Sequence, residues 1–234
     1  DFMEQGGTFA LVTGRSWQIM RPFIGGVPTN GPCAVANGAG IIDIATEEFL
    51  YRRFLPPEAI GHLEEVIARF PDLTCELFRG DHKADVIHPI PFTVDHAEGA
   101  RYTYRVIEDP RETEAEVIKI LFEGEHAFLR ELEAYIRSRP WFAGYELAFS
   151  GKHLMEMTAL GANKGEVTRK LMELLGASPE HLYCAGDQET FVAWMNETAA
   201  RLGMADTHFT NPSGLSGEGH YSSAADMAAL ARAF

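Results

Sequence analysis

The sequence predicts an α/β fold in which a strand–helix core is interrupted by an α+β module and followed by a helical C-terminal segment. Short, continuously apolar runs that end in polar, glycine-flanked turns occur near the N-terminus and again at 183–185, as expected for strands covered on both faces. After Pro56 the pattern changes to several strand candidates separated by helices, which indicates a separate module. We therefore expect core segments at 1–54 and 151–187, the inserted module at 55–150, and the helical segment at 188–234.

The N-terminal core elements follow from their residue patterns. Residues 9–12 (FALV) are typical of a short buried parallel strand, and residues 33–36 (CAVA) form a second such run. Between them, Ser16 is placed to cap a helix whose apolar residues recur at helical spacing. Residues 41–44 and 49–54 are expected to form a hairpin.

The inserted module opens with an amphipathic helix that begins near Pro57. Further elements are expected as strands at 73–78, 101–106, 117–122, 145–149 and 153–157, with a helix at 126–137. The core then resumes with a helix near Lys164 and a strand at 183–185. In the C-terminal segment, residues 190–202 and 224–234 read as helices.

Composition and charge restrict the classes of function. A 46% hydrophobic and 23% charged chain of 234 residues is ordinary for a globular protein. The net charge of −14 argues against nucleic acid or an anionic membrane as partner, and no apolar run reaches the length of about 20 residues that a membrane span needs. The three cysteines are widely spaced in apolar runs, which predicts buried free thiols in a reducing, cytoplasmic environment.

Three predicted strand ends carry polar, glycine-flanked residues, namely Thr13-Gly14-Arg15, Asn37-Gly38 and Gly186-Asp187. In an open parallel sheet, ligands bind beyond the carboxyl ends of the strands. The Thr13 hydroxyl and the backbone N–H groups after it can hold phosphoryl oxygens, while Lys164 can neutralise developing negative charge. The carboxylate of Asp187 is a suitable hard ligand for Mg²⁺. The pattern therefore indicates phosphate chemistry.

Four stretches, LVTGRS, CAVANGAGIID, LMEMTALGANKG and LYCAGD, resemble the Cof-type, sugar-phosphatase-like branch of the haloacid dehalogenase (HAD) superfamily over about residues 1–187. The resemblance implies a Rossmann-like core whose first strand is absent, a large inserted cap, Mg²⁺, and hydrolysis of a small phosphorylated metabolite through an aspartyl-phosphate. It implies catalytic roles for Thr13 and Lys164 and a metal-binding role for Asp187. It also implies that the substrate-binding residues are Gly14, Arg15, Asn37 and Gly38.

The chain departs from that family pattern at the residues that perform the chemistry. HAD enzymes take their nucleophile and general acid from a DxD motif, and this sequence contains none. Covalent catalysis by a carboxylate requires that carboxylate. The usual GDxxND motif is also altered, because Gly186-Asp187 is followed by Gln188 and Glu189. We therefore expect the chain as it stands to be inactive, which leaves a non-catalytic binding domain as an alternative.

From about residue 186 the sequence resembles penicillin-binding-protein type D-alanyl-D-alanine carboxypeptidases, through FVAWMNETAARLGM, THFTNPSGL and GHYSSAADMAALARAF. The resemblance implies a serine peptidase, but the SxxK and KTG motifs that this chemistry needs are absent from the sequence. His220, Ser222 and Ser223 are better interpreted as loop and N-cap residues before the last helix. We interpret the chain as a chimera joined near Asp187, with a carboxypeptidase fragment as the alternative function.

Overall fold

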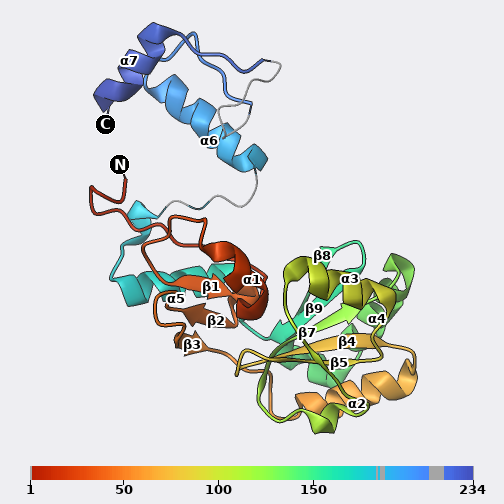
Figure 1. Ribbon diagram of the computed structural model, residues 1–234. Coiled ribbons are helices and arrows are strands. Elements are labelled where there is room, and N and C mark those ends of the chain that lie inside the picture. Colours follow the sequence, from red (N-terminus) through yellow and green to blue (C-terminus); the bar gives the residue numbers. More distant parts are fainter. Residues whose placement is uncertain (1, 183, 185–187, 211–218, 234) are drawn as a thin grey trace. The chain divides into compact units, whose positions relative to one another are not determined.

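A computed structural model describes residues 2–182, 184, 188–210 and 219–233. The chain divides into two compact units, Asp1–Ala177 and Ser178–Phe234, and the division lies ten residues before the join expected near Asp187. The first unit contains a small three-stranded sheet and a larger six-stranded sheet (Figure 1).

The small sheet is an antiparallel meander in the order β1 (Cys33–Val35), β2 (Gly40–Ile42) and β3 (Phe49–Arg52), so the predicted hairpin is confirmed. Alternate residues of β1 point to opposite faces. Cys33 and Val35 pack with α1 (Trp17–Ile24), whereas Ala34 packs with α5 (Lys164–Leu175). One helix therefore covers each face (Figure 1). Ser16 is the N-cap residue of α1, as predicted, although its side chain makes no capping hydrogen bond.

The strand predicted at 9–12 runs parallel to β1, as expected, but its predicted length is wrong. Val12 forms a single parallel bridge with Ala34. The Ala34 N–H donates to the Leu11 carbonyl at 2.8 Å, and the Thr13 N–H donates to the Ala34 carbonyl at 3.0 Å. The described strands of the small sheet are otherwise antiparallel, because the turn η1 (Ala36–Gly38) is too short for the crossover that a parallel pair needs.

The large sheet has the strand order β6-β5-β4-β7-β9-β8, and its neighbours are antiparallel except for β5 and β6. Its strands are β4 (Thr74–Arg79), β5 (Ala84–Ile87), β6 (Arg105–Val106), β7 (Val117–Glu123), β8 (Tyr145–Gly151) and β9 (Leu154–Ala159). The sheet thus continues to Ala159, beyond residue 150 at which the sequence pattern places the end of the module.

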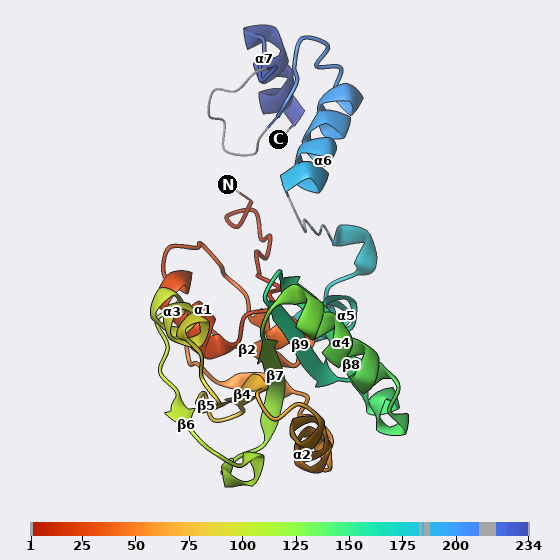
Figure 2. The same cartoon turned by 90° about the vertical axis from the view of Figure 1, so that its right-hand side faces the viewer.

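Helices cover both faces of the large sheet. On one face, α2 (Ala59–Arg69) and α4 (His126–Arg137) enclose the main apolar core with residues such as Leu63 and Leu132. On the other face, α3 (Pro91–Ala100) and α1 pack through Ala97 and Ile19. Figure 2 shows α2 and α4 on one side of the sheet and α1 and α3 on the other. The second face is the one that joins the module to the small sheet.

Two stretches of the module differ from their predictions, and one is β5 (Ala84–Ile87), which was not predicted as a strand. The expected strand at 101–106 is reduced to β6, because α3 ends at a left-handed Arg101 (φ 56°) that turns the chain. The sequence pattern did not indicate α3, whose apolar residues are few and interrupted by Gly99. In contrast, α4 matches the predicted helix at 126–137.

The second unit contains α6 (Gln188–Arg201) and α7 (Ala224–Ala233), which confirms the two predicted C-terminal helices. Asp226 anchors α7, because its carboxylate accepts from the Asp206 N–H and the Thr207 hydroxyl, both at 2.8 Å. Ser223 Oγ accepts from the Asp226 N–H at 3.1 Å. Ser223 is therefore an N-cap residue, as interpreted from the sequence.

Two predictions concern cysteines and membrane spans. Cys33 and Cys75 are buried free thiols as predicted, but Cys184 is exposed. The remainder of the strand predicted at 183–185 lies outside the described residues. Within the part of the chain that the structure describes, no helix is both long and apolar enough to cross a bilayer.

Candidate functional site

A pocket of about 1200 Å³ lies in the first unit, between the loops of the small sheet and the inner face of the large sheet. Five of the residues singled out from the sequence line it together: Thr13, Gly14, Arg15, Asn37 and Lys164. The pocket is also lined by Lys119, Glu146 and Glu156 from the sheet, and by His96 from α3. Asp187, the expected Mg²⁺ ligand, lies outside the described residues.

Gly38 does not line the pocket but determines its shape. Its φ of +108° lies in a region that L side chains rarely adopt, and an added Cβ would come within 2.5 Å of the Asn163 carbonyl oxygen. The neighbouring Asn37 is also left-handed, at φ 56°. This turn therefore approaches the start of α5 closely enough for Asn37 and Lys164 to share one pocket.

Gly14 has a similar role on the adjacent loop. A Cβ at Gly14 would lie 2.5 Å from Asn37 Oδ1, so a larger residue there would displace the Asn37 side chain. Thr13 Oγ1 accepts a hydrogen bond from the Arg15 N–H at 3.2 Å, which fixes a tight turn at the pocket wall. The backbone of this loop is thus held close to the Asn37 side chain.

Lys164 is the first residue of the 12-residue helix α5. Asn163 caps the helix by accepting from the Glu166 N–H at 2.9 Å, and its amide group donates to Glu146 Oε1 at 3.0 Å. The start of a helix carries a partial positive charge, to which the exposed Lys164 ammonium adds a full one. This end of the pocket is suited to an anion.

Arg15 lies at the rim of the pocket and is exposed. Its guanidinium carbon is 5.9 Å from the centre of the Phe23 ring, and that of Arg101 is 5.4 Å from the same ring. The aromatic face holds both cations at one rim. Arg15 and Lys164 are the cationic lining residues at this side of the pocket, which also contains the carboxylates of Asp95, Glu146 and Glu156.

Lys119 and Glu156 form a buried ion pair that sequence reasoning missed. Their side chains are 1% and 6% exposed, and Lys119 Nζ lies 3.2 Å from Glu156 Oε1. Lys119 also donates to the Gly14 carbonyl at 3.0 Å, while Asn37 donates to the other Glu156 oxygen. In the sequence, Lys119 is the single charged residue of the apolar run VIKILF, and Glu156 is the single charged residue of LMEMTA. A lone charge in an apolar strand is the feature that could have identified both residues.

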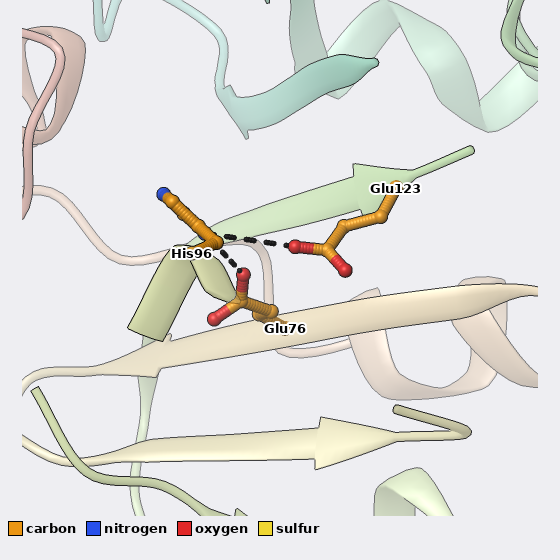
Figure 3. A group of neighbouring side chains, drawn as sticks. All are labelled: Glu76, His96 and Glu123. Atoms are coloured by element: carbon orange, nitrogen blue, oxygen red, sulfur yellow. Dashed lines mark hydrogen bonds and ion pairs between the residues drawn. The ribbon is translucent and has the colours of Figure 1, made fainter. Parts of the chain in front are cut away.

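A second buried cluster lies beside the pocket. His96 Nδ1 is 3.1 Å from Glu76 Oε1 and 3.6 Å from Glu123 Oε1 (Figure 3). The carboxylates of Glu123 and Glu76 raise the pKa of His96 to about 9, and burial raises the pKa of Glu76. These residues are separated widely in sequence, so no local pattern indicates that they meet.

Mg²⁺ does not fit the described residues at the anion end of the pocket. Within the described ranges, the group of three or more metal-binding side chains is Glu76, His96 and Glu123, which belong to β4, α3 and β7 and not to the loops that carry Thr13, Asn37 and Lys164. Glu156 is already paired with Lys119 and Asn37, and Asp187 is not described. We therefore assign no catalytic step to Mg²⁺ here.

Comparison with known proteins gives two family matches. Residues 1–205 match the haloacid dehalogenase-like hydrolases, and residues 181–234 match the D-alanyl-D-alanine carboxypeptidases. The HMP-PP phosphatase of Klebsiella pneumoniae is 27% identical over 192 residues, which cover 79% of this chain and 66% of that protein. The carboxypeptidase DacF of Bacillus subtilis is 52% identical over 50 residues, which cover 21% of this chain and 13% of that protein. The chain thus spans less than two thirds of either relative.

Solved structures show the same fold. A haloacid dehalogenase-like hydrolase from Bacteroides thetaiotaomicron has a TM-score of 0.70 at 22% identity, covering 82% of this chain and 73% of that chain. A sugar phosphatase of HAD subclass IIB has a TM-score of 0.63 at 16% identity, covering 76% and 66%. Proteins of this family typically use Mg²⁺. The chain therefore belongs to the haloacid dehalogenase-like hydrolases, and its residues 181–234 match the D-alanyl-D-alanine carboxypeptidases.

Proposed function

We propose that this chain binds a small, sugar-phosphate-like metabolite in the 1200 Å³ pocket and does not hydrolyse it unaided. The observation that carries the proposal is the convergence of Thr13, Arg15 and Lys164 on one pocket from separate parts of the chain. A phosphate monoester needs positive charge and N–H donors, and these residues supply both at one end.

The phosphate group is assigned to the end formed by the Thr13–Arg15 turn and the start of α5. There the Lys164 ammonium, the N-terminus of α5 and the Arg15 guanidinium are available to phosphoryl oxygens. The remainder of the metabolite is assigned to the side of the pocket that the large sheet lines. Glu146 and the Lys119–Glu156 pair offer hydrogen-bonding groups that suit sugar hydroxyls.

Hydrolysis by the aspartyl-phosphate route requires a carboxylate nucleophile. The 234 residues contain no DxD motif, and Glu156 in the pocket is held by Lys119 and Asn37. We therefore expect binding without turnover from this chain alone. We assign the binding activity to the cytoplasm, because phosphorylated metabolites occur there and because Cys33 and Cys75 are free thiols.

Calorimetric titration of the full chain with glucose 6-phosphate and with glucose tests the proposal. We expect binding of the phosphate ester alone, weakened about tenfold or more in Lys164→Ala, because that variant removes a charged partner. Lys170→Ala is the matched control, since Lys170 is on the same helix and pairs with Glu173. Equal affinity for sugar and sugar phosphate, or an unaltered affinity in Lys164→Ala, would contradict the proposal.

A p-nitrophenyl phosphate assay with and without Mg²⁺ tests the second half of the proposal. We expect no hydrolysis above the uncatalysed rate. Turnover that is abolished by Thr13→Ala would show that the chain supplies its own nucleophile. That result would contradict the expectation that the chain is inactive.

A further inference from the structure

The geometry points to a transition-metal site formed by Glu76, His96 and Glu123 beside the pocket. One ligand atom from each of these side chains lies within 4.8 Å of the others. Figure 3 shows the imidazole edge of His96 directed at both carboxylates. The inference does not depend on the proposed phosphate binding, because none of the three residues belongs to the anion end.

Three separate elements bring these side chains together. Glu76 is on β4 and Glu123 is at the end of β7, and the register pairs Thr74 with Glu123, so the two glutamates are diagonal neighbours on one face. Helix α3 covers that face and directs His96 between them. Rigid strands and a packed helix therefore hold all three ligands, as a metal site requires.

The spacing of the ligand atoms suits a tetrahedral metal. With metal–ligand bonds of about 2.1 Å, neighbouring ligand atoms of a tetrahedral zinc site are separated by about 3.4 Å. The distances from His96 Nδ1 to Glu76 Oε1 and Glu123 Oε1 are 3.1 and 3.6 Å. The two glutamate oxygens lie within 4.8 Å of each other, so one ion can contact all three atoms after the glutamates adjust.

The second oxygen of each carboxylate is already held. The Tyr102 hydroxyl donates to Glu76 Oε2, and the Thr93 hydroxyl donates to Glu123 Oε2. Each glutamate is therefore anchored through one oxygen and presents the other to His96. Metal sites use such outer hydrogen bonds to orient their ligands.

Glu123 Oε1 is an independent indication that a ligand belongs here. This oxygen is buried and forms no hydrogen bond, and its described contact is the ion pair with His96 Nδ1 at 3.6 Å. His96 Nδ1 can offer only one proton, so it cannot serve both carboxylates at once. A buried carboxylate oxygen that forms no hydrogen bond is costly, and a divalent cation would satisfy both glutamates together and balance their charge.

The donor set indicates which metal is bound. One imidazole and two carboxylates suit Zn²⁺ and other first-row transition ions, whereas Mg²⁺ prefers six oxygen ligands, several of them water. His96 lines the pocket, whereas Glu76 and Glu123 are buried and are not among its lining residues. We assign the fourth ligand position to water.

Metal titration of the chelator-treated full chain tests the site. We expect one Zn²⁺ or Co²⁺ per chain by elemental analysis, with Co²⁺ giving the visible absorption of a tetrahedral site, and no displacement by excess Mg²⁺. His96→Gln should lower the affinity by at least tenfold. His153→Gln is the matched control, because His153 also lies beside a glutamate, Glu125, at 3.7 Å but in an exposed pair.

A second variant keeps the test decisive if His96→Gln fails to fold. Tyr102→Phe retains every ligand and removes only the hydroxyl that orients Glu76, so we expect about tenfold weaker metal binding with an unchanged far-UV circular dichroism spectrum. Absence of bound Zn²⁺ would overturn the inference. Equal losses in His153→Gln and His96→Gln would also overturn it, as would displacement by Mg²⁺ at similar concentration.

Discussion

Replacing Lys119 with methionine removes one partner of the ion pair that joins the large sheet to the loops of the pocket. Glu156 would then keep Asn37 as a donor but would lose a cation 3.2 Å away, in a place where its side chain is 6% exposed. The Gly14 carbonyl would also lose its contact with the ammonium group. Methionine is the closest apolar match in length, so packing against Phe78 is largely retained.

The expected loss of stability follows from that burial. Removing one member of a buried ion pair costs about 3–5 kcal/mol, because the other charge is left without a counter-charge. We expect about 3 kcal/mol for Lys119→Met, since Asn37 still donates to Glu156. The double variant Lys119→Met with Glu156→Leu should differ from the wild type by no more than about 1 kcal/mol, because it leaves no buried charge.

Urea unfolding followed by tryptophan fluorescence measures these changes. Trp194→Phe serves as the background, because it leaves Trp17 and Trp141 as reporters of the first unit. The slope of unfolding free energy against urea concentration should be equal among variants. Strictly additive losses in the double variant would refute the reasoning, because they would show that the two charges do not interact.

Three further outcomes are expected. Gly38→Ala should destabilise the chain by about 2 kcal/mol or more in the same assay, because Gly38 has a positive φ and an added Cβ would clash with Asn163. As a control, Gly61→Ala on the open surface of α2 should stabilise the chain by about 0.5–1 kcal/mol. The hydrogen bond from Trp141 lowers the pKa of Glu65 below 4.5, so its stabilising contribution is present above pH 4.5 and is lost as the pH falls through the lowered value. Trp141→Phe should therefore raise that pKa in an NMR titration, and an unchanged value would contradict the assignment. Fluorescent penicillin should give no covalent adduct with the full chain, since SxxK and KTG are absent, and a labelled band on a denaturing gel would contradict this expectation.

Local sequence patterns determined several elements and five of the residues that line the pocket. The helix at 126–137, the hairpin of the small sheet and the start of α5 at Lys164 follow from periodicity and capping residues within short windows. Thr13 and Asn37 were found because glycine-flanked polar residues at strand ends are recognisable in the chain itself. The binding roles of these residues stay predictions.

The tertiary structure alone decided which buried charges meet. Lys119 and Glu156 are on different strands, and the hydrogen bond between them depends on the register of β7 and β9. Glu76, His96 and Glu123 come together only because α3, which the sequence pattern did not indicate, covers β4 and β7. Periodicity reports which face a residue occupies and does not report its neighbours across the sheet. Those contacts arise from packing between elements far apart in the sequence, and they determine where the charges in this pocket are paired.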